Sequence, residues 1–329
     1  MRNATIMVSG AFAPERVITN QYFNDLLGED VDTWLREKVH IHERRWCLPD
    51  QSTADLCEAT ALQILERANL KASELDLIIV STDTPEFISP STASVLQHRI
   101  GAKNAGTFDI NTACAGFVTA LDVGAKYIRA DEQYEYILVI GAYAMSKYLN
   151  LEDKKTVTLF ADGAGGVLLK AEKDSKRGFQ ASQLLSMGEY NEWMGIYGGA
   201  TKYPISEKVL SNHDHQLKFV KRFPPELNPE KWSELAKNLN QRIGVNSENV
   251  DQFFITQINI NSIWETMDRL GINRGKAHTI MHQYGYTGSA CIPMAFNDAL
   301  EKGIVKSGDL VYFIGSGGGL AFASTAFYL

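Results

Sequence analysis

TFDINTACAGFVTALDVGAKYIRADEQYEYILVIG, residues 107–141, combines two apolar strand-like runs with an amphipathic stretch between them. Thr107–Ile110 predicts a short strand and Tyr136–Gly141 a buried one, because brief apolar runs bounded by polar residues are typical of buried strands. Residues 115–130 predict a helix, since apolar side chains recur three or four positions apart, at Phe117, Leu121, Ala125 and Ile128. A strand, a helix and a strand in this order indicate an α/β fold.

Similar units flank this stretch. Leu75–Thr82 (LDLIIVST) predicts a buried strand, and Ser89–Thr92 starts a helix that runs to His98 with a proline near its first turn. Phe160–Leu169 (FADGAGGVLL) predicts a strand entered through a glycine-rich turn. The N-terminal MRNATIMVSGAFAPER predicts a first strand and not a secretion signal, because its apolar run is short. We therefore expect a cytoplasmic protein.

The second half of the chain echoes the first. The matched segments are SELDLIIVST (73–82) with ENVDQFFITQ (248–257), YILVIGA (136–142) with DLVYFIGS (309–316), and FDIN (108–111) with TIMH (279–282). Similarity on so long a period predicts a duplicated α/β unit. We place the halves at residues 1–172 and 173–329, with an insertion of loops and short helices near 186–232 that lies over a site.

Composition narrows the classes of function. The 329 residues include 32 Lys and Arg against 39 Asp and Glu, a formal charge of −7, so a nucleic-acid binder with its basic face is not expected. No apolar run reaches the roughly 18 residues that a membrane span requires. The four cysteines are too scattered for a disulfide scaffold, and His213 and His215 have no third ligand at helical spacing, so no metal site is expected.

Cys114 is the sharpest candidate for chemistry. It lies in Asn111–Phe117 (NTACAGF), between the predicted strand and helix. Free N–H groups at a helix N-terminus favour a thiolate, so the sequence predicts a nucleophile near neutral pH. Small neighbours leave room for an incoming acyl group. The alternative is that Cys114 is a small core residue beneath a helix.

The segment Gly315–Gly319 (GSGGG) follows a predicted strand. Glycine permits close backbone approach, so the N–H groups of this segment could join that of Cys114 in an oxyanion hole. A plain turn is the alternative. No Lys-Ser/Thr pair follows, so a phosphate-binding loop of the P-loop type is unsupported.

Taken in order, these segments resemble the ketoacyl-acyl-carrier-protein synthase III family of the thiolase superfamily. The resemblance covers nearly the whole chain, and its most specific parts are the cysteine segment and Ala161–Gly165 (ADGAG). It implies an α/β fold of five layers, αβαβα, built from two pseudo-duplicated halves, and a homodimer that pairs through residues 104–110. It also implies an acyl-CoA substrate, an acyl carrier protein as a further partner, and no cofactor beyond CoA or carrier-bound phosphopantetheine as the substrate carrier.

The resemblance assigns roles residue by residue. Cys114 matches the nucleophile that takes the acyl group as a thioester, and Gly317 and Gly318 match the region of the second oxyanion donor. Trp34 falls where the family stacks an aromatic ring on the CoA adenine, with a surface anchor as the alternative. Lys38 and Lys154 fall where family arginines contact the CoA phosphates, so the charge is kept but the bidentate fork is lost.

The sequence departs from the family at three positions. Thr256 replaces the histidine and Tyr286 the asparagine that donate hydrogen bonds to the malonyl thioester during loss of carbon dioxide, and Asn261 replaces an arginine used for carrier docking. Each new hydroxyl group is one donor and replaces the lost donors in part. His282 lies four residues before Tyr286, at the end of a predicted strand, and is a candidate base or donor; the alternative is that it orders the loop.

Three functions remain open. The first is a condensing enzyme in which Cys114 passes its acyl group to a malonyl-type carbanion, with Thr256, Tyr286 and His282 in the donor roles. The second is acyl transfer without decarboxylation to an oxygen, nitrogen or sulfur acceptor, which needs only a nucleophile and an oxyanion hole. The third is a non-catalytic partner subunit of an active synthase, against which the retained cysteine argues.

Overall fold

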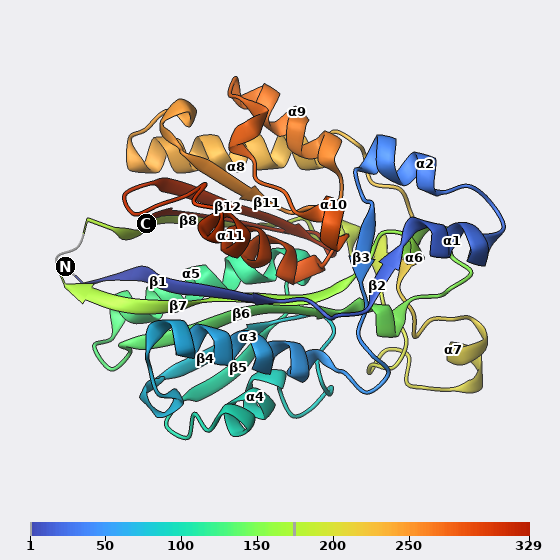
Figure 1. The fold of residues 1–329 in the computed structure, drawn as a ribbon, viewed down its shortest axis with the longest axis horizontal. Helices are drawn as coiled ribbons and strands as arrows, with labels where there is room; N and C mark the ends of the chain where they lie inside the picture. Colours follow the sequence, from blue (N-terminus) through green and yellow to red (C-terminus); the bar gives the residue numbers. More distant parts are fainter. Residues whose placement is uncertain (1, 174–175) are drawn as a thin grey trace.

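The computed structural model describes residues 2–173 and 176–329, which form two sheets separated and covered by helices (Figure 1). The first sheet has the strand order β1-β7-β6-β4-β5. Its strands are β1 (Arg2–Phe12), β4 (Leu77–Ser81), β5 (Gly106–Ile110), β6 (Tyr136–Ala144) and β7 (Asp162–Lys173). β4 lies parallel to both β5 and β6, so the carboxyl ends of these three strands meet at one edge. Every residue of β4 is buried, as its continuous apolar sequence predicts.

The second sheet repeats the order of the first. Its strands are β8 (Gly178–Ser186), β13 (Ala321–Tyr328), β12 (Leu310–Gly317) and β11 (Gln252–Ile255), in that order across the sheet. In place of a fifth strand there is a single parallel bridge between Phe253 and Ala277. The pseudo-duplication expected from the sequence is therefore confirmed, but its third match is wrong: residues 281–284 form a helix, α10 (Met281–Tyr284), and not a strand.

Five layers result from these two sheets. Helices α3 (Thr53–Ala68) and α4 (Thr92–Ile100) cover the outer face of the first sheet, and α8 (Leu227–Ile243) and α9 (Ile260–Leu270) lie outside the second. Between the sheets lie α5 (Gly116–Ala130) and α11 (Cys291–Glu301). Each central helix is preceded by a 3₁₀ turn, η3 (Ala113–Ala115) or η8 (Gly288–Ala290). The αβαβα arrangement implied by the resemblance is thus confirmed (Figure 1).

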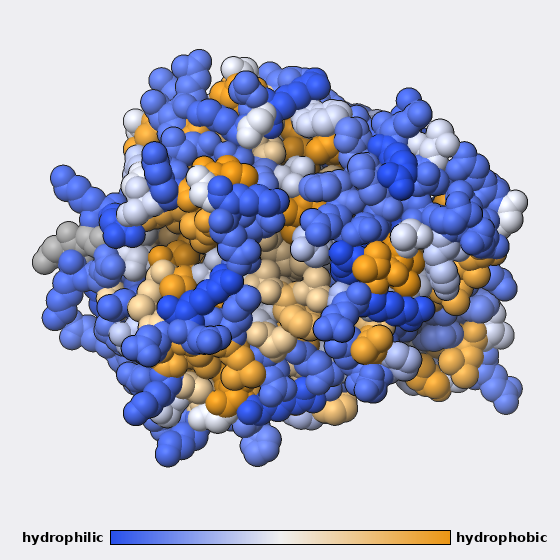
Figure 2. All heavy atoms as spheres, viewed as in Figure 1, coloured by the Kyte–Doolittle hydropathy of each residue, from blue (hydrophilic) through white to orange (hydrophobic). Residues whose placement is uncertain are grey.

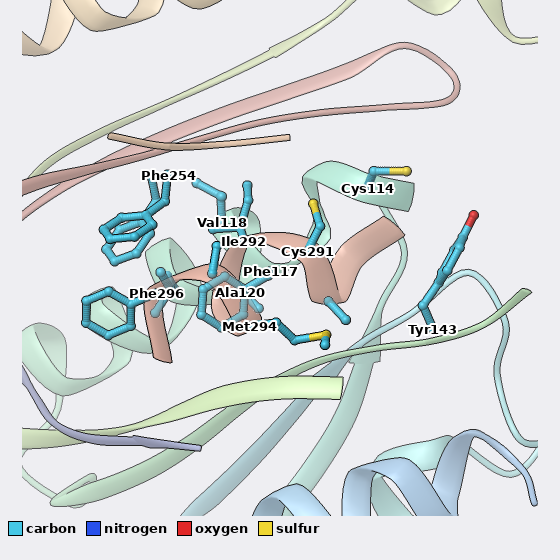
Figure 3. Close-up of a cluster of buried hydrophobic side chains, with 14 of the residues drawn as sticks. Cys114, Phe117, Val118, Ala120, Tyr143, Phe254, Cys291, Ile292, Met294 and Phe296 are labelled. Carbon is cyan, nitrogen blue, oxygen red and sulfur yellow. The ribbon is translucent and has the colours of Figure 1, made fainter. Parts of the chain in front are cut away.

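The core between the sheets is built from aromatic rings. Phe313 of β12 contacts Phe254, Phe296 and Phe117, with ring centroids 5.5, 5.1 and 6.3 Å apart. Each of these residues is almost fully buried. Burial of apolar side chains is the dominant favourable contribution to the stability of a folded protein. Cys114 lies at one end of this cluster (Figure 3).

The remaining elements are short. They are β2 (Val17–Thr19), α1 (Asn20–Leu27), α2 (Asp32–Trp34), η1 (Leu35–Val39), β3 (Glu43–Arg45), η2 (Ala72–Glu74), η4 (Met145–Tyr148), α6 (Lys154–Val157), η5 (Gly188–Tyr190), β9 (Met194–Gly195), α7 (Glu207–Ser211), β10 (Lys218–Phe219), η6 (Ser247–Asn249) and η7 (Arg274–Lys276). The segment between β8 and α8 carries only such short elements. α8 begins at Leu227 and packs on the second sheet, so the insertion expected near 186–232 extends into a helix of the core fold.

Polar residues cover most of the face shown in Figure 2, and apolar residues appear between them in separate patches. None of the helices in residues 2–173 and 176–329 is both long enough and apolar enough to cross a membrane.

Candidate active site

Cys114 lies in the tight connection between β5 and α5. The connection turns sharply, because Ala113 has a positive φ of 46° and Cys114 then enters the 3₁₀ turn η3. The pseudo-equivalent Gly288 has nearly the same φ, 49°, at the start of η8. Gly116 begins α5 against the Ser81 hydroxyl, where a Cβ atom would collide with it. These features hold the cysteine, which is 2% exposed, just ahead of the first turn of α5.

Burial and two neighbouring side chains shift the pKa of the Cys114 thiol. Burial raises its pKa well above the ordinary value, and the negative charge of Asp83 raises it further. A hydrogen bond between the Tyr286 hydroxyl and the sulfur lowers the pKa in part. Burial therefore acts against the thiolate expected from the sequence and the Tyr286 hydrogen bond acts in its favour, so the thiolate stays a prediction.

Glycines of β12 bring the second half of the chain against the cysteine. A Cβ atom on Gly317 would lie 2.6 Å from the backbone nitrogen of Cys114, and one on Gly315 would lie 2.9 Å from Cα of Ala115. Only residues without side chains permit this approach. Gly317 and Gly318 line the same pocket as Cys114, as a shared oxyanion hole requires.

Thr256 follows β11 and faces the same pocket. Its Oγ1 accepts a hydrogen bond of 2.9 Å from the Ser316 N–H, and the Ser316 carbonyl is 3.4 Å away. The 2.9 Å bond occupies a lone pair of Oγ1 and does not use the hydroxyl proton. That proton makes only the long 3.4 Å contact with the Ser316 carbonyl. Thr256 can therefore donate that proton to a group in the pocket.

Tyr286 stands over Cys114 on a segment fixed at both ends. Its backbone N–H donates to the Leu159 carbonyl, at 2.9 Å, and its carbonyl accepts from the Ala161 N–H, at 2.9 Å. Its ring packs against Phe160 with centroids 5.3 Å apart. The side chain is 1% exposed, so the hydroxyl has a fixed direction toward the sulfur.

The pocket at Cys114 is narrow, with a volume of about 70 Å³, and opens beside a larger groove of about 660 Å³. The pocket is lined by Cys114, Met194, Phe219, Phe223, Pro224, Leu227, Asn228, Thr256, Ile258, Tyr286, Ser316, Gly317, Gly318 and Leu320. The groove shares Phe219, Phe223, Pro224, Asn228 and Ile258 with it. The pocket and the groove are therefore adjacent.

The groove combines an exposed indole with several cations. Trp34, 50% exposed, and Lys38 line it, together with Lys155, Lys221 and Arg222. Lys154 does not line it, because its ammonium group pairs with Glu29 at 2.9 Å. Asn261 lines the groove and donates a hydrogen bond of 2.8 Å to the Lys38 carbonyl.

His282 is not brought to the cysteine. It lies in α10 beside His42, with ring centroids 6.3 Å apart, and its carbonyl accepts the His42 N–H. Burial lowers the pKa of both rings. Among the residues that the structure describes, no histidine lines the Cys114 pocket. The backbone contact matches the alternative interpretation of His282, a residue that orders its loop.

Other residues near the site were missed from the sequence. Lys155, Lys221, Arg222 and Asn228 lie on short loops or a helix end with no recognisable motif. Asp83 and Tyr143 lie at or directly beyond the carboxyl ends of β4 and β6. The sequence could have indicated Asp83 and Tyr143 through their place at the carboxyl ends of predicted parallel strands, because ligands of α/β folds bind at that edge of the sheet.

Comparisons with known proteins agree with this geometry. A family model described as 3-oxoacyl-[acyl-carrier-protein (ACP)] synthase III matches residues 108–188, and the model of its C-terminal part matches residues 240–329. The β-ketoacyl-[acyl-carrier-protein] synthase III of Clostridium perfringens is 35% identical over 327 residues, 98% of each chain. That of Staphylococcus epidermidis is 33% identical over 324 residues, 98% of this chain and 97% of the relative.

Solved structures show the same relationship. The crystal structure of 3-oxoacyl-[acyl-carrier-protein] synthase III from Aquifex aeolicus superposes with a TM-score of 0.89 at 29% identity, covering 99% of this chain and 100% of the other. The chain therefore belongs to the 3-oxoacyl-[acyl-carrier-protein] synthase III family and is an acyltransferase, a condensing enzyme acting on acyl thioesters.

Proposed function

We propose that Cys114 takes an acyl group from an acyl-CoA and passes it to a malonyl-type carbanion in a decarboxylative Claisen condensation. The observation that carries this proposal is the shared wall between the pocket of Cys114 and the cationic groove. A thioester carrier that lies in the groove can reach the sulfur with its slender arm. No cofactor is consumed, since CoA or carrier-bound phosphopantetheine only delivers the acyl group.

The groove suits the nucleotide end of CoA. Trp34 offers an exposed aromatic face for the adenine ring, and Lys38, Lys155, Lys221 and Arg222 offer positive charge for its phosphates. Lys155 thus takes the place that the sequence gave to Lys154. An acyl carrier protein would present the same phosphopantetheine arm for the second substrate.

Loading exchanges one thioester for another. The Cys114 sulfur attacks the acyl carbonyl carbon, the bond from that carbon to the CoA sulfur breaks, and the cysteine proton ends on CoA as its thiol. Negative charge on the carbonyl oxygen faces the N–H of Cys114 and the adjoining Gly317–Gly318 backbone. Fixed backbone donors aimed at this oxygen are the largest single contribution that such a site makes to rate.

Condensation needs donors for the enolate that forms as carbon dioxide leaves. The weakly held proton of Thr256 and the Tyr286 hydroxyl both face the pocket. The enolate carbon then attacks the acyl carbon on Cys114, and the cysteine leaves as thiolate. His282 has no part in this sequence, because it lies outside the pocket.

One observation favours the second function, acyl transfer without decarboxylation. Thr256 and Tyr286 stand where the family has a histidine and an asparagine as its two enolate donors, so each of those donors is replaced by a single hydroxyl group. Loss of a single oxyanion donor costs roughly two to three orders of magnitude in rate. Transfer to an alcohol, amine or thiol would need the oxyanion hole but no enolate donors.

Loading is tested by intact-mass measurement after incubation with a panel of acyl-CoAs. We expect one acyl mass increment in the wild type and in Cys57→Ala, a variant of a cysteine in a different core cluster, and none in Cys114→Ala. Absence of any increment, with acyl-CoA or with acyl carrier protein, would favour the non-catalytic partner subunit.

Carbon dioxide release from malonyl thioester then separates the two enzymatic functions. Condensation requires release that depends on a loaded Cys114. Transfer without decarboxylation predicts loading, no release, and deacylation by a nucleophilic acceptor.

We also expect a homodimer. β5 is an edge strand of the first sheet, and its residues are only partly buried or exposed. Pairing with β5 of a second copy would satisfy the backbone groups along that edge. Light scattering at micromolar concentration that reports a monomer would overturn this expectation.

A further inference from the structure

A second groove, which we call the insertion groove, lies entirely within the segment between β8 and α8. It has a volume of about 940 Å³, and all of its lining residues fall between 191 and 221. It shares Val220 and Lys221 with the groove beside the Cys114 pocket, so the two grooves adjoin. It shares no residue with the Cys114 pocket itself. The insertion therefore presents a surface next to the entrance of the site and outside it.

The backbone holds the ridge between the two grooves in place. β10, which begins the ridge, pairs with β9. The N–H groups of Val220 and Lys221 then both donate to the Trp193 carbonyl, at 2.8 and 3.1 Å. The Lys221 ammonium group lies 5.5 Å from the centre of the Trp193 ring. The ridge is thus tied to the rest of the insertion along its length.

The insertion groove carries positive charge without an ion-pair partner. Lys208 of α7 and Lys221 are exposed, and neither forms an ion pair with any residue that the structure describes. The acidic residues of the lining, Glu192 and Asp214, already pair with other lysines, at 3.4 and 2.6 Å. Arg222 follows Lys221 and lines the first groove, so cations face both sides of the ridge. This face is cationic although the whole chain has a formal charge of −7.

Apolar side chains stand exposed in the same groove. Ile205 is 61% exposed, and Tyr203 and Val220 are about half exposed. Exposed apolar groups beside cations are typical of a surface that binds another protein. The charges favour a partner whose surface is acidic, because opposite potentials attract across an interface.

Helix α9, on the other side of the first groove, offers no such charge. Asn261 stands where the family has an arginine used for carrier docking. The one cation of α9, Arg269, pairs with Glu265 at 2.8 Å. Arg274, which follows the helix, pairs with Asp268 at 2.6 Å. An acidic partner would therefore meet balanced charge on α9 and unpaired cations on the insertion.

We propose that an acidic acyl carrier protein docks on the insertion groove, with its carboxylates near Lys208 and Lys221 and its apolar side chains against Ile205. Its phosphopantetheine arm would then enter the adjoining groove beside the Cys114 pocket. This inference rests on the proposed function, because it concerns the carrier that delivers the second substrate. It places carrier docking on the insertion and not on α9.

The test compares two reactions of the same enzyme. One is loading of Cys114 from acetyl-CoA, followed by the intact mass of the enzyme. The other is condensation on malonyl-acyl carrier protein, followed by the intact mass of the carrier. The probe is the acyl carrier protein of Clostridium perfringens, the source of a relative that is 35% identical to this chain.

Lys208→Glu should lower kcat/KM for the carrier-borne substrate about tenfold, because it places like charges face to face, and the loss should shrink at high salt. Ile205→Asp should act in the same direction, since it removes an apolar contact and adds a negative charge. Both variants should load from acetyl-CoA at the wild-type rate, because neither residue lines the first groove or the Cys114 pocket.

Two further charge reversals are the controls. Lys237→Glu changes an exposed lysine of α8 that lines neither groove, and it should match the wild type in both reactions. Arg269→Glu places the same change on α9 and should leave the carrier reaction near its wild-type value.

Three results overturn the docking site alone. They are a carrier reaction that Lys208→Glu and Ile205→Asp leave unchanged, a loss in acetyl-CoA loading equal to the loss in the carrier reaction, and a greater loss in Arg269→Glu than in Lys208→Glu. Use of malonyl-CoA but not of the malonyl carrier by the wild type also overturns it. Failure of the wild type to load from any acyl-CoA overturns the proposed loading step itself.

Discussion

At the scale of single residues, the chemistry of Cys114 depends on its immediate neighbours. Burial and Asp83 raise the pKa of the thiol, and Tyr286 acts in the opposite direction through its hydrogen bond. The Tyr286 hydroxyl is therefore the side-chain donor that favours the thiolate. This arrangement suits an enzyme that should react with a bound thioester and not with solutes at large.

Removal of the Tyr286 hydroxyl should make Cys114 less acidic. In Tyr286→Phe the ring remains but the group that lowers the thiol pKa is gone. We expect slower alkylation by iodoacetamide at fixed pH, a pH profile displaced upward, and a fall in turnover of about a hundredfold. Tyr127→Phe, an exposed tyrosine, should match the wild type. An unchanged alkylation profile would contradict the role of the hydroxyl.

Replacement of Asp83 should stabilise the protein at neutral pH. Burial raises the pKa of Asp83 from 3.8 to about 6, so the folded state binds a proton that the unfolded state has already lost. Folding stability therefore falls as pH rises from about 4 to 6, by at most about 3 kcal/mol. Asp83→Asn removes this effect, so urea unfolding should show the variant to be more stable than wild type at pH 7.5.

The difference between Asp83→Asn and wild type should shrink toward pH 4, where the carboxyl is protonated in both states. A stability difference that does not change with pH would mean that Asp83 is not the group responsible.

At the scale of elements, the two halves meet through equivalent contacts. Gly315 of β12 packs on η3, and Gly141 of β6 packs on η8. The 3₁₀ turn before each central helix thus packs against a glycine from the sheet of the opposite half. This exchange places the Gly317 backbone against Cys114.

Gly317→Ala should damage both stability and loading. Its Cβ atom would lie 2.6 Å from the Cys114 nitrogen, so β12 or η3 must move. We expect a loss of about 1–3 kcal/mol of unfolding free energy and a strong fall in the acylation rate. Gly188→Ala is the control, because a Cβ atom there meets nothing within 4 Å. Equal behaviour of the two variants in urea titrations and loading assays would rule out the close approach.

At the scale of the whole molecule, a polar cluster around Arg67 links the two halves. Arg67 of α3 donates to the Ser9 carbonyl of β1, at 2.9 Å, and to Asn297 of α11, at 2.8 Å. It also pairs with Glu301 at 2.6 Å. Three acceptors on two further elements make this arginine a link between the first sheet and the central layer.

Loss of that link should cost more than loss of an ordinary surface pair. Arg67→Ala should lower the unfolding free energy by about 1–3 kcal/mol, since it leaves the nearly buried Asn297 with fewer partners. Arg269→Ala removes an exposed pair with Glu265 and should cost less than about 1 kcal/mol. Denaturant unfolding of both variants makes the comparison, and equal losses would mean that the cluster adds nothing to the contact between the halves.

The sequence by itself determined the strand and helix pattern, the duplication and the place of Cys114 between β5 and α5. These follow from periodicity and chain order, which are local properties. The resemblance named Thr256, Tyr286, Gly317 and Gly318, and the structure brings all four to the Cys114 pocket.

Only the tertiary structure decided the rest. It showed a buried Cys114 whose pKa burial raises, an ion-paired Lys154 with Lys155 at the groove, a His282 outside the pocket, and the unpaired Asp83 and Tyr143. The physical reason is the same in each case. Burial, ion pairing and the absence of a partner depend on residues that are far apart in the chain and meet only when the two halves pack.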